Sequence, residues 1–177
     1  RGGLRVRRYF LPVIIISLFV FESMAIDIFP LHSLHEEWII VPRFVLIALI
    51  FITIYGGLYF GIVYSLVFGF LMDIVYTGVM GIYIFSFTLV AYAAYMIMKV
   101  IHNHGIVAVF AAMISVVLVE YVAYSIHSII GTTTMMHEQF LQARLLPTLV
   151  FNGVVAIILV YPLKKFLNKL VLEMNDE

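Results

Sequence analysis

Apolar runs long enough to cross a lipid bilayer follow one another along almost the whole chain. A bilayer core about 30 Å thick needs a helix of about 20 residues, and only short polar or glycine-containing connections separate the runs. The hydrophobic share of the sequence is 64%, whereas a soluble domain has about half. The sequence therefore predicts an all-α, polytopic membrane protein, a six-transmembrane-helix bundle that forms one integral membrane domain over residues 1–177. The expected spans are about 9–29, 39–55, 57–75, 80–101, 105–127 and 145–163.

Basic residues indicate how these spans are oriented. Four arginines lie within residues 1–8, Lys99 ends the fourth span, and three lysines follow the sixth. Cytoplasmic connections carry an excess of lysine and arginine, and an even number of spans brings all these residues to one side. Both termini are therefore expected in the cytoplasm. The first run also has the form of a signal peptide with a small-residue site at 23–25, but the five further spans favour its retention.

Composition and motifs argue against several classes of function. The sequence has no cysteine, which removes disulfides, thiolate catalysis and cysteine metal sites. Its net charge of zero argues against a nucleic-acid partner. The segment HSLHEEW at 32–38 lacks the HExxH order, so we expect no metal there. With no GxSxG, P-loop, GxGxxG or paired-carboxylate motif, we expect neither catalytic residues nor a cofactor, and the protein is predicted not to be an enzyme.

Small residues recur at every fourth position of the third expected span. Gly57, Gly61, Ser65 and Gly69 are followed in the same register by Asp73. Four residues turn an α-helix by about 400°, so these positions form one slowly drifting stripe, and small side chains let another helix approach closely in lipid. The stripe is predicted to receive either another helix of this chain or the helix of a partner. Asp73 is a functional candidate because a charge in a membrane span needs a partner or water.

Several charged side chains lie within or at the ends of the spans, in the layer that the orientation places on the outer side. They are Asp27, Arg43, Asp73, Glu120 and Arg144. A buried unpaired charge costs several kcal/mol, so we expect the arginines to pair with these acids, although the sequence does not say which acid meets which arginine. Two interpretations remain open: a set of ion pairs that fixes the helix order, and an outward-facing polar pocket or relay.

Glu22 belongs to the same intramembrane network but lies nearer the middle of the membrane, without a basic neighbour in its own layer. Burial disfavours the charged form of a carboxyl group. We therefore expect Glu22 to be protonated, or to form a hydrogen bond with Asn152 or a serine.

The third span ends in FGFLMD at 68–73, and Gly78 and Gly81 open the next run. In this stretch above all, the sequence resembles the MreD family of bacterial rod shape-determining membrane proteins. The Glu22-Ser23 pair in the first span, the basic N-terminus and the basic end of the chain also match the family.

The resemblance implies a non-enzymatic scaffold of the cell-elongation machinery in the bacterial cytoplasmic membrane. Such a protein would bind the single-span protein MreC and so influence lateral peptidoglycan synthesis by RodA with its transpeptidase, with a link to MreB filaments inside the cell. We expect the MreC span to dock on the stripe in the surrounding lipid. The interface would comprise Gly57, Gly61, Ser65, Gly69, Asp73, Gly78 and Gly81.

The family also resembles, in fold, the six-helix substrate-binding subunits of energy-coupling-factor vitamin transporters. This likeness supplies an alternative function, a vitamin-binding subunit of a membrane transporter. The first span lacks the Ala-x-x-x-Ala patch typical of such subunits, which counts against the alternative. The outer charged layer would still suit a ligand pocket.

Overall fold

The computed structural model describes residues 2–28, 38–101 and 105–175, and every regular element in these ranges is a helix. Side chains are described for residues 10–25, 38–101 and 105–172. The α-helices are α1 (Gly2–Ile28), α2 (Phe44–Phe51), α3 (Leu58–Met72), α4 (Ile82–Val100), α5 (Gly105–Ile130), α6 (His137–Gln139) and α7 (Leu146–Asn175). Three π-helical turns continue or precede them: η2 (Ile52–Gly56), η3 (Asp73–Thr77) and η4 (Phe140–Leu145).

Among the described residues, four helical stretches are long and apolar enough to cross a membrane. They are Leu58–Thr77, Ile82–Val100, Gly105–Ile130 and His137–Leu172. Two shorter apolar helices, Phe10–Ala25 and Phe44–Gly56, correspond to the first and second expected spans. The all-α fold is therefore confirmed, with helices that are able to span a membrane. The number of six spans and the cytoplasmic termini stay predictions.

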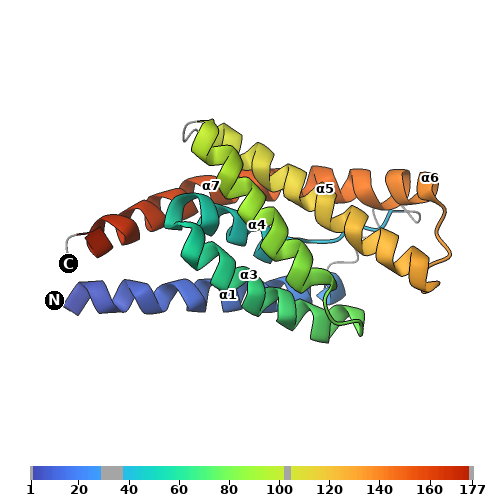
Figure 1. Cartoon of the computed structure of the whole chain (residues 1–177), viewed down its shortest axis with the longest axis horizontal. Coiled ribbons are helices and arrows are strands. Elements are labelled where there is room, and N and C mark those ends of the chain that lie inside the picture. The colour runs from blue at the N-terminus through green and yellow to red at the C-terminus, as the bar shows by residue number, and fades with distance from the viewer. Residues whose placement is uncertain (1, 29–37, 102–104, 176–177) are drawn as a thin grey trace.

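The helices run along the length of the molecule, and the chain begins and ends at the same end of the bundle (Figure 1). The opposite end carries α6, the last turns of α1, α3 and α5, and the first turn of α4 (Figure 1). We call this the distal end. The break expected at Gly56-Gly57 is present as a tight connection between η2 and α3, and Gly57 has a φ of 99° there.

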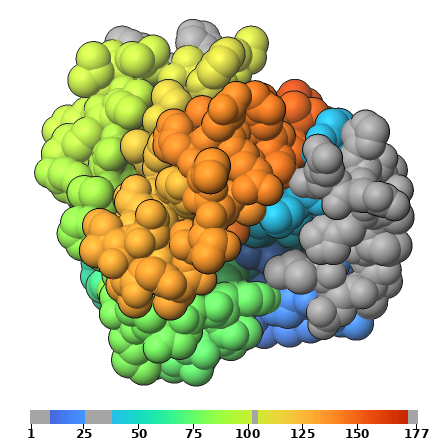
Figure 2. All heavy atoms as spheres, turned by 90° about the vertical axis from the view of Figure 1, so that its right-hand side faces the viewer, coloured from blue at the N-terminus to red at the C-terminus, as the bar shows by residue number. Residues whose placement is uncertain are grey.

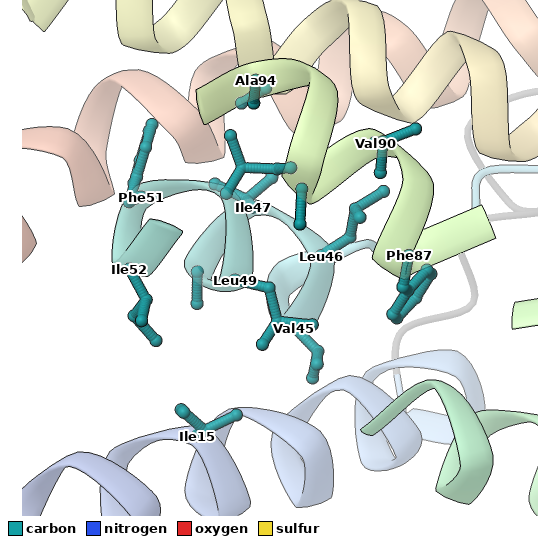
Figure 3. Packing of buried hydrophobic residues seen from close by; sticks show 14 of the residues in the cluster. Ile15, Val45, Leu46, Ile47, Leu49, Phe51, Ile52, Phe87, Val90 and Ala94 are labelled. Carbon is teal, nitrogen blue, oxygen red and sulfur yellow. The ribbon is translucent and has the colours of Figure 1, made fainter. Parts of the chain in front are cut away.

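Helix α2 is the centre of the core. It contacts α1, α3, α4, α5 and α7, and every residue from Phe44 to Phe51 is buried. Its sequence, FVLIALIF, has no polar side chain on any face, which is the pattern of a helix enclosed on all sides. Figure 3 shows its side chains meeting Phe87, Val90 and Ala94 of α4 on one side, with Ile15 of α1 on the other.

The small-residue stripe of α3 packs inside the chain. A Cβ added to Gly61 would lie 2.6 Å from Thr53 Cβ on η2, and one added to Gly69 would lie 2.7 Å from the carbonyl oxygen of Tyr83 on α4. Ser65, between them, is fully buried. The chain's own helices thus occupy the stripe, which corrects the expectation that the helix of a separate partner docks at these three positions.

The other glycines of the expected interface shape turns. Gly57, Gly78 and Gly81 have φ values of 99°, 62° and 112°, in the region that glycine enters at little cost and other residues rarely adopt. A Cβ at any of the three would meet no atom within 4 Å. Their observed role is therefore backbone conformation at the two ends of α3 with its η3 extension, rather than close helix packing.

The close approach of α3 to α4 predicts a large effect of one methyl group. Gly69→Ala would place its Cβ 2.8 Å from Ile84 Cα, and separating the two backbones should destabilise the fold by about 1–3 kcal/mol. Gly153→Ala in α7 is the matched control, because its Cβ would meet only the flexible end of Met113 at 3.5 Å. Thermal unfolding in detergent should give a lower melting temperature for Gly69→Ala alone. Equal melting temperatures would show that the α3–α4 contact can relax.

Candidate functional site

Side chains of α7 bind residues 38–43, the segment that leads into α2 and that we call the approach to α2. Residues 38–43 have no helical structure, so the first part of the expected span 39–55 is not α-helical. Its backbone groups therefore need hydrogen-bond partners elsewhere in the protein. Asn152 Nδ2 donates to the carbonyl oxygen of Val41 at 2.8 Å, and Asn152 Oδ1 accepts from the backbone N–H of Arg43 at 2.8 Å. Thr148 Oγ1 accepts from the N–H of Val41 at 3.1 Å. These bonds fix the backbone from which the Arg43 side chain projects.

Glu22 of α1 binds the first turn of the same helix. Its carboxylate accepts a hydrogen bond of 2.8 Å from the backbone N–H of Val45, one of the N–H groups that a helix start leaves without an intrahelical partner. A carboxylate there also meets the positive end of the helix dipole. Of the alternatives expected for Glu22, the hydrogen bond to Asn152 is not formed, because Asn152 binds the backbone that precedes α2. The two side chains share the start of α2 instead.

Arg43 and Arg144 both pair with Glu120. Arg43 Nε donates to Glu120 Oε1 at 2.7 Å, and Arg144 Nε donates to Oε2 at 3.0 Å. Glu120 is 0% exposed, Arg43 4% and Arg144 32%. Arg43 Nη2 also donates to the hydroxyl of Tyr83 at 2.9 Å. This Arg–Glu–Arg triad joins α5 to the starts of α2 and α4 and to η4, and it carries two positive charges against one negative.

Asp73 does not pair with either arginine. Its carboxylate accepts from the backbone N–H groups of Gly81 at 2.9 Å, Tyr83 at 2.8 Å and Ile84 at 3.2 Å. It therefore caps α4 from the end of the preceding helix, as a side-chain oxygen at a helix start does. The expectation that Asp73 belongs to the charged network is therefore corrected. Among the hydrogen bonds of the described residues, Asp73 is connected to the triad only through Tyr83, whose hydroxyl accepts from Arg43.

A cavity of about 240 Å³ opens beside the triad. Its polar lining comes from five helical elements and from the segment ahead of α2, and it consists of Glu22, Arg43, Tyr76, Thr77, Tyr83, His127 and Arg144. Figure 2 shows a recess at the distal end, between the orange segment that leads into α7 and the green segment that leads into α4, with blue and cyan segments at its floor. The structure thus contains both arrangements left open by the sequence, ion pairs between helices and a polar pocket.

Thr148, Tyr83 and His127 were not singled out from the sequence as members of this site, and Asn152 was considered only as a partner of Glu22. Thr148 and Asn152 lie four residues apart on α7, so they share one helix face, and that polar pair is a signal for the clamp on residues 38–43. Tyr83 and His127 offer no such pattern. Asp27 lies outside the residues whose side chains the structure describes, as does the histidine and glutamate segment 32–37. Among the residues searched, no group of three potential metal ligands lies together.

Comparison with known proteins identifies the family. A family model described as rod shape-determining protein MreD matches residues 7–170. This chain belongs to the MreD family. An MreD relative, the rod shape-determining protein MreD of Bacillus subtilis (strain 168), is 32% identical over 171 residues, which cover 97% of this chain and 99% of that protein. No solved structure matches the chain, so the fold likeness of MreD to vitamin-transporter subunits stays a prediction.

The shared pairing of Glu120 makes its charge critical for stability. Glu120→Gln would leave two guanidinium groups without their carboxylate, and breaking a buried pair costs about 3–5 kcal/mol. Glu138→Gln, an exposed position on α6, is the control with the same chemical change. The melting temperature in detergent should fall for Glu120→Gln and stay at the original value for Glu138→Gln. A Glu120→Gln protein as stable as the control would contradict the ion-pair role.

The capping role of Asp73 predicts a local effect. Asp73→Asn puts an amide NH₂ against backbone N–H groups, and leaving buried donors unsatisfied costs about 1–3 kcal/mol. Hydrogen exchange measured by mass spectrometry should become faster at the amides of Gly81, Tyr83 and Ile84, whereas exchange in the middle of α5 should change less. Unchanged exchange at these three amides would contradict the capping role.

Proposed function

We propose that this chain is a non-enzymatic membrane scaffold that takes part in determining rod shape by binding MreC. The observation that carries the proposal is the family match over residues 7–170, together with an alignment to the Bacillus subtilis protein that covers nearly all of both chains. The match is spread over the whole membrane domain rather than confined to one motif. The proposed role therefore belongs to the domain as a unit.

The use of the acidic groups supports a scaffold rather than an enzyme. Glu22 and Asp73 accept hydrogen bonds from backbone N–H groups at the first turns of helices, and Glu120 forms ion pairs with two arginines. An acid or base in catalysis must reach the proton that it transfers, whereas these carboxylates are engaged in holding helices together. Each of them thus has a structural task that accounts for its burial.

For the topology, we propose six passes through the bacterial cytoplasmic membrane with both termini inside. The four long helices supply four passes. The apolar part of α1 supplies another, and α2 with η2 completes the sixth by combining a short helix with the non-helical approach at 38–43. The distal end then faces the outside, and the basic residues near both termini lie in the cytoplasm, in agreement with the positive-inside rule.

The MreC contact must use a surface other than the stripe of α3, which the chain itself fills. Exposed apolar side chains at the distal end offer one. Ile129 at the end of α5 is 86% exposed, and Met136 just before α6 is 77% exposed. We place the contact here, where the part of MreC outside the membrane would meet it. Through MreC, the chain would influence RodA with its transpeptidase and connect to MreB.

The alternative function as a vitamin-binding subunit is not favoured. The family comparison points to shape determination. The polar cavity, of about 240 Å³, is smaller than the usual range of about 300–1,000 Å³ for small-molecule sites.

Reciprocal co-purification with MreC tests the proposal. The double variant Ile129→Ser, Met136→Ser should lower the recovery of MreC about tenfold, because apolar anchor residues of an interface contribute on the order of 1–2 kcal/mol. Ile106→Ser is the matched control, since Ile106 is 72% exposed at the opposite end of the same helix. Absence of MreC from the unmodified protein would contradict the binding itself. Equal recovery with all variants would contradict the location.

A further inference from the structure

The polar cavity at the distal end has a feature that the scaffold role does not use. Its wall carries two guanidinium groups that share a single carboxylate. A guanidinium has five N–H donors and no acceptor. Arg144 uses its Nε on Glu120, and Arg43 uses Nε and Nη2 on Glu120 and Tyr83. Within the described part of the chain, no acceptor binds either Nη group of Arg144 or Nη1 of Arg43.

Both arginines line a cavity that has room for a small group. The cavity of about 240 Å³ lies against both arginines, and Arg43 is almost fully buried there. Its volume is below the range of about 300–1,000 Å³ for drug-sized ligands. A group as large as a phosphate with a short substituent suits it better than a whole lipid or a vitamin.

The charges on the wall select the kind of group. Guanidinium N–H groups fit the oxygens of phosphate in paired hydrogen bonds, and the triad has one positive charge in excess. Glu22 lines the same cavity, and its carboxyl group can accept a hydrogen bond from a donor on the ligand. A phosphodiester with one negative charge satisfies both walls when its substituent offers a hydroxyl or ammonium donor to Glu22.

We propose that the distal cavity binds a phosphate group, held by Arg43 and Arg144, of the kind that a phospholipid headgroup presents. The recess opens at the end of the bundle seen in Figure 2, and Tyr76, 38% exposed, lines it. A headgroup of the surrounding bilayer reaches such a position from the membrane surface, and free phosphate supplies the same chemistry from solution. This inference stands independently of MreC binding.

Arg144→Gln is the variant that tests the site. Arg144 is 32% exposed, and Glu120 would keep Arg43 as its buried partner after the change, so we expect the variant to fold. Arg144→Lys keeps the charge but lacks the planar fork, and it should show an intermediate loss. Lys169→Gln, an exposed position near the other end of the bundle, is the control. A size-exclusion profile and melting temperature for each variant establish that it is folded.

The full chain, stripped of lipid in detergent, is then offered phosphatidylglycerol, phosphatidylethanolamine or diacylglycerol, and retained lipid is counted by native mass spectrometry. Both phospholipids should be retained over diacylglycerol, which lacks phosphate. Arg144→Gln should lower their retention about tenfold, because a hydrogen bond to a charged group contributes enough to change affinity by that factor. Lys169→Gln should leave retention unchanged.

A second arm separates the two sources of phosphate. If inorganic phosphate raises the melting temperature of the unmodified protein but not of Arg144→Gln, while no phospholipid is retained selectively, the site takes free phosphate and the proposed chemistry holds. Equal retention of every lipid by all variants, without any response to phosphate, would overturn the proposal. A stabilisation that depends on Arg144 and arises only with MreC would also overturn it, because the occupant would then be protein.

Discussion

A helix that begins inside a membrane protein leaves its first backbone N–H groups without partners, and the distal end of this fold is organised by supplying those partners. Lipid offers no hydrogen bonds, so every such group must be satisfied by the protein. Glu22 and Asn152 do this for the approach and first turn of α2, and Asp73 does it for α4. Each of these side chains comes from a different helix than the one it serves. The polar groups therefore set which helices are neighbours.

The Arg–Glu–Arg triad adds a second constraint at the same level of the bundle. Removing charges from water costs several kcal/mol per ion, so a buried ion pair contributes little net stability even when its geometry is good. Separating the partners is far more costly. The triad of Arg43, Glu120 and Arg144 consequently penalises any arrangement in which α2, α5 and η4 do not meet. Tyr83 extends this constraint to α4, since its hydroxyl accepts from Arg43 while its backbone N–H binds Asp73.

Local sequence patterns predicted the features that depend on local physics. The apolar runs indicated membrane helices, and Gly56-Gly57 indicated a sharp connection because glycine adopts a positive φ at little cost. The stripe of α3 indicated a close helix contact, but a small-residue face does not say which helix fills it. The likeness to a family with a known partner suggested an outside helix, whereas Thr53 and Ile84 of the chain itself occupy the space next to Gly61 and Gly69.

Such local patterns could not predict which polar side chains pair when they lie far apart in the sequence. Asp73 was assigned to the charged layer because its depth matched that of the arginines, but depth does not reveal that three backbone N–H groups lie closer. In the same way, nothing in the sequence separated Glu120 from the other acids as the partner of both arginines. The pairings follow from the angle at which helices cross, which is determined by the packing of the whole core.

The bonds that clamp residues 38–43 also restrict the order in which the protein can be completed. Val41 and Arg43 bind Thr148 and Asn152, which lie 107 to 111 residues later in the chain. A ribosome releases the second hydrophobic element long before it makes the seventh helix. Until then, the polar backbone ahead of α2 has to remain near water or find temporary partners, because α7 does not yet exist to bind it. The backbone ahead of α2 thus obtains these hydrogen bonds only after the first turns of α7 have been made.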